Sequence, residues 1–370
     1  MNNIFKKIAI LTLLALLRPE NSYSLSINEL LIIANENSLI IQADSEYLKK
    51  FQNDIELAKK NNDPSITLSG FAGAKHQETE SSESSFNPRN VNITLSKNLF
   101  DGYRTKYSII QAEELSLQAA YLFDDLRQNV YLQAINAYLD LIHMRQSYNL
   151  TEQSLILSKN NLDFKSQQYK SGDISNIELE KAKLEYSKFE FNLKKIQVSI
   201  SNQEDLILDY IDIVPDTVDY PDLVNGNIDL APVSLIEYAL NNNPSIKSSQ
   251  IYLKILEHSK MIERSANLPK IDVEAGINRN WDATDSSGQA DEYSIIGTIS
   301  IPLYESEEVN IKESNINLDI IRNDKILKDK INNLKKEITS LVNNIQLLKK
   351  EYELENSQKT IFEKDIEIKQ

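Results

Sequence analysis

The sequence predicts a mainly helical protein with four strands: long coiled-coil helical hairpins that form a cylinder, and strands that contribute to a trimeric twelve-stranded transmembrane β-barrel. Two observations carry this prediction. The 370 residues contain only 8 Gly and 9 Pro, about 2% each against a typical roughly 7% and 5%, so the elements between turns are long. Most of the chain repeats apolar residues at three- and four-residue steps, whereas four segments alternate apolar and polar residues.

The composition excludes several functional classes. A formal net charge of −15 argues against nucleic-acid binding, because binding phosphate requires a basic surface. The absence of Cys excludes disulfides, thiolate nucleophiles and Cys-ligated metals. His76, His143 and His258 lack the paired spacing of a metalloenzyme, so we expect them to be surface or interface residues. We therefore predict that the protein is not an enzyme and has no catalytic residues, cofactor or metal site.

Residues 1–24 have the features of a secretory signal peptide. Lys6 and Lys7 precede the apolar run Ile8–Leu17, and small residues follow near position 24. A transmembrane anchor is the alternative, but ten helical residues span only about 15 Å of a hydrocarbon core of about 30 Å. No later stretch approaches 18 apolar residues. We therefore expect an exported chain whose membrane-crossing part is built from strands.

Two copies of one unit follow each other at a shift of about 205 residues. Ala34–Ile66 aligns without a gap onto Ala239–Ile271, so that Pro64 falls on Pro269. Each aligned segment begins with helical periodicity, and the helix should end just before its proline, which disfavours helical geometry at the preceding residue. Pro64 and Pro269 are therefore predicted helix-to-strand positions. The predicted regions are a signal peptide (1–24), a first repeat (25–212), a linker (213–232) and a second repeat (233–370).

Each predicted helix is followed by a pair of alternating segments. The segments are Ile66–Ala74, Val91–Ser96, Ile271–Asn278 and Tyr293–Ile301, and the polar loops Glu78–Asn90 and Asp282–Asp291 join them in pairs. One half-buried face of a sandwich would give the same pattern, but four strands among long helices cannot form a sandwich core. Apolar–polar alternation over about ten residues suits an outer-membrane barrel. Four strands cannot close a barrel, whereas three chains supply twelve, so we expect a homotrimer.

Very long helices are predicted after each strand pair. Neither Gly nor Pro lies between Gly102 and Gly172, so a helix of about 100 Å is expected over Tyr103–Tyr169. Gly102 and Gly172 are the predicted turn positions at its two ends. Ser175 and Glu178 then form an S-x-x-E capping box that starts a return helix.

The second repeat contains a matching long segment. Seven apolar residues between Leu327 and Leu348 follow alternating four- and three-residue steps, which is the heptad pattern of coiled coils. An extended structural coiled coil explains these heptads equally well when they are considered alone. Together with the strand pairs, they favour a helical cylinder below a barrel.

Short motifs recur in a recognisable order along the chain. They lie in Asn98–Arg104, Gln168–Ala182, Leu268–Ile271 and Ser300–Tyr304. Their order and spacing resemble those of the TolC family of outer-membrane efflux and secretion channels, over essentially the whole mature chain. The resemblance implies a homotrimer with a barrel in the outer membrane, in contact with its lipid, and a helical tunnel in the periplasm.

The resemblance also implies that the protein transports molecules and catalyses no reaction. The chain would be the exit duct of a tripartite efflux pump or type I secretion system that passes drugs or proteins to the exterior. Its partners would be a periplasmic adaptor (membrane fusion) protein and an inner-membrane pump or ABC exporter. Glu178 would lie near the periplasmic entrance, where three carboxylates favour cations. The alternative is that Glu178 serves only in its capping box.

One departure from the family pattern leaves alternatives open. The second-repeat equivalent of Gly172 falls near position 376, so we expect the second hairpin and the last return helix to lie outside these 370 residues. A non-functional fragment of a channel is therefore one alternative. An exported coiled-coil scaffold or a periplasmic adaptor is another, although adaptors have one hairpin flanked by small β domains rather than two repeated strand pairs.

Overall fold

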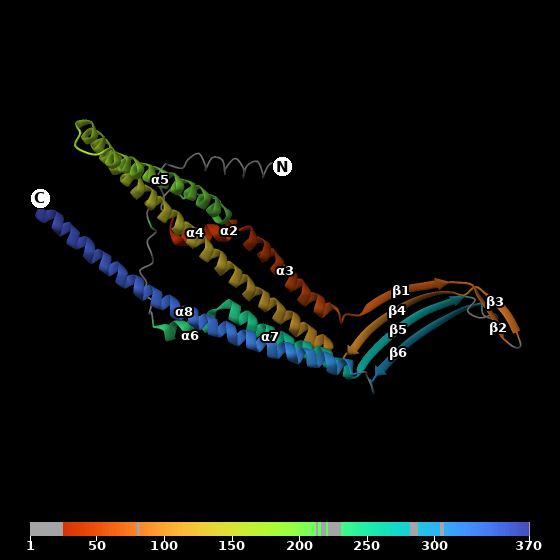
Figure 1. Cartoon of the computed structure of the whole chain (residues 1–370). Helices are drawn as coiled ribbons and strands as arrows, with labels where there is room; N and C mark the ends of the chain where they lie inside the picture. Colours follow the sequence, from red (N-terminus) through yellow and green to blue (C-terminus); the bar gives the residue numbers. More distant parts are fainter. Residues whose placement is uncertain are drawn as a thin grey trace. The chain divides into compact units, whose positions relative to one another are not determined.

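The computed structural model describes residues 25–79, 82–211, 214–215, 220, 231–281, 288–303 and 307–369. The predicted signal peptide and most of the predicted linker lie outside these residues. The helices are α2 (Ile27–Asn37), α3 (Leu39–Lys60), α4 (Arg104–Ser171), α5 (Asn176–Ile211), α6 (Pro232–Asn242), α7 (Pro244–Arg264) and α8 (Glu308–Lys369). The strands are β1 (Ser65–Ala72), β2 (Lys75–Thr79), β3 (Ser82–Phe86), β4 (Arg89–Phe100), β5 (Lys270–Trp281) and β6 (Gln289–Ser300) (Figure 1).

Contacts divide the chain into two compact units, which do not follow the predicted repeats. The first unit combines Met1–Asp44 with Leu126–Asn227, and the second combines Ser45–Asp125 with Ile228–Gln370. The predicted repeats were delimited by aligning the sequence with itself, whereas the two units are delimited by contacts between residues, so the two divisions need not coincide. The repeat boundaries stay a prediction.

The core of the first unit forms where α2 packs against the paired helices α4 and α5. Tyr138 is fully buried there, and its hydroxyl donates a hydrogen bond of 2.8 Å to the carbonyl of Leu25. Two alanines of α4 are also buried in this core, and small side chains let helices approach closely. The buried residues are Leu30, Ala34, Ala134, Ala137, Tyr138, Leu141, Ile142, Ile207 and Ile211.

The second unit contains a four-stranded antiparallel sheet in the order β1-β4-β5-β6 (Figure 1). Beyond the sheet, α7 packs along α8, with Ile251 and Ile255 of α7 and Leu327 of α8 among the buried side chains. Later in the α8 heptad pattern, Leu341 and Leu348 are exposed. The predicted long helices are confirmed, because α4 has 68 residues and α8 has 62. Within the described part of the chain, no helix combines the length and hydropathy that crossing a bilayer requires.

The helix predicted at the start of each repeat is interrupted, which the sequence analysis missed. The first is broken at Ser38, with φ −64° and ψ 113°, and the second at Asn243, with φ −65° and ψ 119°. At the second break, Pro244 disfavours helical geometry at Asn243, whose side chain caps the next helix by accepting a 3.0 Å hydrogen bond from the Ile246 amide. The two breaks lie at equivalent positions of the aligned repeats.

The polar loops are shorter than predicted. Most of Glu78–Asn90 is ordered as the hairpin β2–β3 and the start of β4, and β6 begins at Gln289, inside the predicted loop Asp282–Asp291. Backbone pairing holds β2 to β3 without an apolar face, so hydrophobic alternation could not indicate this hairpin. Residues 282–287 lie outside the described part.

A charged network joins α7 to α8. The carboxylate of Glu313 lies 3.2 Å from the Lys260 ammonium and accepts a hydrogen bond from the Arg264 guanidinium. Lys312 lies 3.5 Å from a carboxylate oxygen of Glu263 on α7. The hydrogen bond from Arg264 is the main cause that lowers the pKa of Glu313 below its ordinary value of 4.5, and partial desolvation opposes this shift.

This network predicts an acid-sensitive contact. Because the folded-state pKa of Glu313 is lowered, its contribution to stability is fully present above its unfolded pKa and is lost as the pH falls through the folded pKa. We expect Glu313→Gln to flatten the loss of stability from about pH 5 down to about pH 3, measured as the urea midpoint across this range. Glu46→Gln is the control, because Glu46 pairs with Lys49 on an exposed surface. The same acid slope in Glu313→Gln and in the unmodified chain would contradict the prediction.

Candidate functional site

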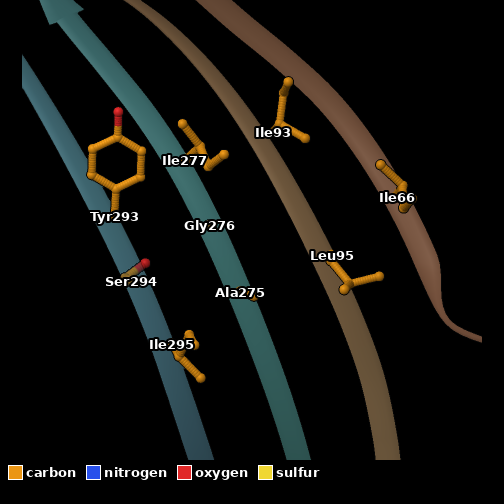
Figure 2. A pocket seen from close by; sticks show the side chains of 9 residues that line it. All are labelled: Ile66, Ile93, Leu95, Ala275, Gly276, Ile277, Tyr293, Ser294 and Ile295. Atoms are coloured by element: carbon orange, nitrogen blue, oxygen red, sulfur yellow. The ribbon is translucent and has the colours of Figure 1, made fainter.

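The sheet of the second unit has one apolar face. Side chains of all four strands form two cross-strand rows on it, which the register lines up as Ile66–Leu95–Ala275–Ile295 and Leu68–Ile93–Ile277–Tyr293. Figure 2 shows these side chains, Leu68 excepted, around a shallow hollow of 470 Å³. Ile66 is 75% exposed and Ile295 is 83% exposed. A contiguous exposed apolar surface marks a site of contact with lipid, another protein or a ligand.

The opposite face is polar and internally hydrogen-bonded. Its rows include Ser69–Asn92–Asn278–Glu292 and Thr67–Thr94–Gly276–Ser294. The amide of Asn90 donates to Asn278 and, over 2.9 Å, to Asn280. Further along the face, the Asn98 amide donates a 2.8 Å hydrogen bond to Asp272. A face of amides, hydroxyls and carboxylates is suited to water.

Near one end of the apolar face lies an ion pair. The Arg279 guanidinium donates two hydrogen bonds to the Asp291 carboxylate, from Nε over 2.6 Å and from Nη2 over 2.8 Å. These residues are opposite each other in the β5–β6 register. The pairing neutralises both charges at the border of the apolar rows.

A tight turn connects the sheet to α4. Gly102 is buried and has φ +69°, and a Cβ atom there would lie 2.6 Å from the Ser265 carbonyl oxygen and 2.8 Å from Leu268 Cβ. The Asp101 carboxylate accepts a 2.7 Å hydrogen bond from the amide of Thr105, which caps the start of α4. The first-repeat turn therefore contacts the end of the second-repeat helix with no space for a side chain.

The α4–α5 hairpin turns through Gly172, which has φ +84°. Its amide donates to the Tyr169 carbonyl over 3.1 Å, and the Asp173 amide donates to the Gln168 carbonyl over 2.9 Å. These two bonds form a Schellman motif, which ends α4. The next helix, α5, starts with the Ser175 hydroxyl accepting a 3.3 Å hydrogen bond from the amide of Glu178. The Glu178 side chain is exposed.

The structure brings together only some of the predicted positions. Gly102 and the residue before Pro269 meet at the junction just described, whereas Pro64 lies between the end of α3 and β1. In the first unit, Gly172 lies in the turn between α4 and α5, and Glu178 lies in the first turn of α5. In the described ranges, no cluster of three or more His, Asp or Glu side chains is placed to hold a metal ion.

Besides the two-faced sheet and the long helices, the sequence itself matches a known protein family. A sequence profile of the family described as "Outer membrane efflux protein" matches residues 30–203 and 235–361, most of the chain. The chain belongs to this family. The resemblance identified from the sequence is thereby confirmed, and the protein is assigned to the outer membrane. The outer membrane efflux proteins are a transport family rather than an enzyme family.

Individual relatives are distant. Outer membrane efflux protein BepC of Brucella suis biovar 1 (strain 1330) is 23% identical over 216 residues, which cover 58% of this chain and 47% of that protein. The chain therefore spans about half the length of this relative.

Solved structures share the fold of the outer membrane efflux protein. A membrane protein from Pseudomonas aeruginosa matches with a TM-score of 0.75 and 13% identity, over 89% of this chain and 78% of its own. The outer membrane protein VceC of Vibrio cholerae matches with a TM-score of 0.71 and 15% identity, over 86% and 79%. At these identities the likeness concerns the fold alone, and it confirms the predicted fold class.

Proposed function

We propose that this outer membrane efflux protein is the exit duct of a tripartite efflux pump or type I secretion system. The observation that carries the proposal is the sheet, which is apolar on one face and polar on the other. In a closed barrel the apolar face contacts lipid, and the polar face lines a water-filled passage.

Closure of the barrel requires further copies of the chain. The two edge strands, β1 and β6, run in opposite directions because each of the three pairings between them is antiparallel. The β6 edge of one copy can therefore pair antiparallel with the β1 edge of the next. Three copies provide twelve strands and leave no exposed edge.

The helices supply the periplasmic part of the proposed duct. At 1.5 Å per residue, the 68 residues of α4 extend about 100 Å. In this proposal the α4–α5 turn approaches a periplasmic adaptor, and an inner-membrane pump or ABC exporter provides the energy. The exposed Glu178 carboxylate would then act near the entrance, while its backbone amide completes the helix cap. Drugs or proteins pass through without any covalent step.

Cysteine labelling in intact cells tests the proposed duct. The natural chain contains no Cys, so single-cysteine variants have no background. We expect a charged, water-soluble thiol reagent to modify Ser294→Cys on the polar face and to leave Ile295→Cys on the apolar face unmodified. Chemical crosslinking of the same cells should yield a trimer in the outer-membrane fraction. Equal labelling of both positions in a soluble monomer would contradict the duct and favour the exported-scaffold alternative.

A further inference from the structure

Helix α5 carries apolar residues on two sides, and the chain covers one of them. Leu179 and Ala182 are buried on the first side. The residues of the second side recur at seven-residue steps, which are close to two helical turns, so their side chains lie along one line. They are between 56% and 69% exposed. This α5 stripe consists of Ile177, Leu184, Phe191 and Val198.

Lysines alternate with the apolar residues of the α5 stripe. Lys181, Lys188 and Lys195 each follow an apolar residue of the stripe by four positions, and all three are exposed. Among the described residues of this stretch, the ion pair is that of Lys183 with Glu180, away from the three stripe lysines. A shallow hollow of 480 Å³ lies along the stripe, and its lining includes Lys181 and Lys188. The stripe is therefore apolar with a positive edge.

Helix α8 carries a stripe of the same spacing and the opposite charge. Its apolar residues are Leu347, Leu354 and Ile361, between 64% and 66% exposed. The positions four residues after them are also exposed. These positions hold Glu351, Gln358 and Asp365. The α8 stripe is distinct from the heptad pattern of α8, because it lies about a third of a turn around the helix from Leu341 and Leu348.

The topology gives the two stripes opposite directions in the proposed duct. Strands β4 and β6 run in the same direction, because both pair antiparallel with β5. The helices that follow them, α4 and α8, therefore leave the same end of the sheet, whereas α5 returns after the turn at Gly172. In one antiparallel register, Lys181 lies opposite Asp365 and Lys195 lies opposite Glu351. To within one residue, the same register aligns Leu184 with Ile361, Phe191 with Leu354, and Val198 with Leu347.

We infer that the α5 stripe of one copy binds the α8 stripe of the next copy. The inference rests on the proposed duct, in which copies of the chain stand side by side. A second copy is the occupant because both stripes are exposed within one chain and because the lysines of one match the acids of the other. Charges beside an apolar seam determine partner and orientation in coiled coils. A contact of α5 with α5, or of α8 with α8, would oppose like charges instead.

Disulfide formation in the full chain tests the contact, since the natural chain contains no Cys. Phe191→Cys combined with Leu354→Cys should form disulfides in the oxidising periplasm and give linked dimers and trimers on non-reducing electrophoresis. Leu184→Cys combined with Ile361→Cys is a second, independent pair. The matched control combines Phe191→Cys with Asn356→Cys, which places the second thiol on the opposite side of α8 and should leave monomers.

Charge reversal tests the proposed match of lysines with acids. In the Leu184→Cys and Ile361→Cys background, we expect Lys195→Glu to lower the yield of linked chains by about threefold to fivefold, the scale of an exposed ion pair. Adding Glu351→Lys should restore the yield, because the two charges are then opposite again. An unchanged yield in Lys195→Glu, or no recovery in the swapped pair, would overturn the charge match.

The outcomes separate this contact from the duct itself. A disulfide within one chain, seen as a monomer of altered mobility, would overturn the second copy as occupant. A trimer that chemical crosslinking detects, but that neither cysteine pair links, would overturn the contact and leave the duct standing. Absence of a trimer in the unmodified chain would overturn the duct and, with it, this inference.

Discussion

Lysine in place of Ile295 is expected to prevent stable insertion of the protein into the outer membrane. Ile295 is 83% exposed on the apolar face, and in the barrel its side chain contacts lipid. Lysine on the lipid face near the bilayer midplane costs about 2–4 kcal/mol per chain, and each trimer carries three copies. We expect the folded trimer in the outer-membrane fraction to fall by more than tenfold, measured by crosslinking and fractionation.

The neighbouring isoleucine provides a matched control. Ile296 is adjacent in β6 and belongs to the polar face, opposite Glu274 in the register. We expect Ile296→Lys to leave trimer yield nearly unchanged, because its ammonium lies in the aqueous lumen near that carboxylate. An equal loss of trimer in both variants would mean that the two faces of β6 contact the same environment rather than lipid on one side and water on the other. That result would contradict the duct.

Alanine in place of Gly102 is expected to cost about 2–4 kcal/mol of folding free energy. The added Cβ would lie 2.6 Å from the Ser265 carbonyl oxygen, so a backbone segment would have to move. Overpacking of this kind costs about 1–3 kcal/mol. The positive φ adds about 1 kcal/mol for a residue other than glycine. The measurement is the urea midpoint of the trimer in detergent, together with its slope.

Gly172 separates the two causes of this loss. Its φ is also positive, at +84°, but a Cβ atom there would meet nothing within 4 Å. We therefore expect Gly172→Ala to cost only about 1 kcal/mol. If both alanine variants lost the same stability, the close approach to Ser265 would contribute nothing, and the tight junction at Gly102 would not be needed for folding.

The length of the first long helix could be predicted, because a helix continues until a residue such as Gly or Pro ends it and such residues are rare in this sequence. With no Gly or Pro between Gly102 and Gly172, the predicted helix Tyr103–Tyr169 differs from α4 by at most two residues at either end. The break at Ser38 has no proline beside it, and its only local signal is the pair Asn37-Ser38, because Asn and Ser favour helix ends over helix interiors. The equivalent break at Asn243 precedes Pro244 and could have been inferred from that proline.

The acidic polar face could not be assembled from the sequence. Alternation places Glu274 on the polar side of its own strand, but it does not determine the register between strands. Glu292 lay between the predicted loop and the predicted strand that starts at Tyr293, so no face could be assigned to it. The pairing of β5 with β6 places Glu292 opposite Asn278, and this register assigns Glu292 to the polar face.

The equivalent helix breaks at Ser38 and Asn243 have a consequence for assembly. Each half of the chain brings a broken helix, two strands of the four-stranded sheet and at least one long helix, so a half-length ancestor would need six copies to provide twelve strands. Each association step costs translational and rotational entropy, by estimates of about 4–15 kcal/mol. Joining two halves in one polypeptide reduces five such encounters to two, and it lets a ring close at far lower chain concentration.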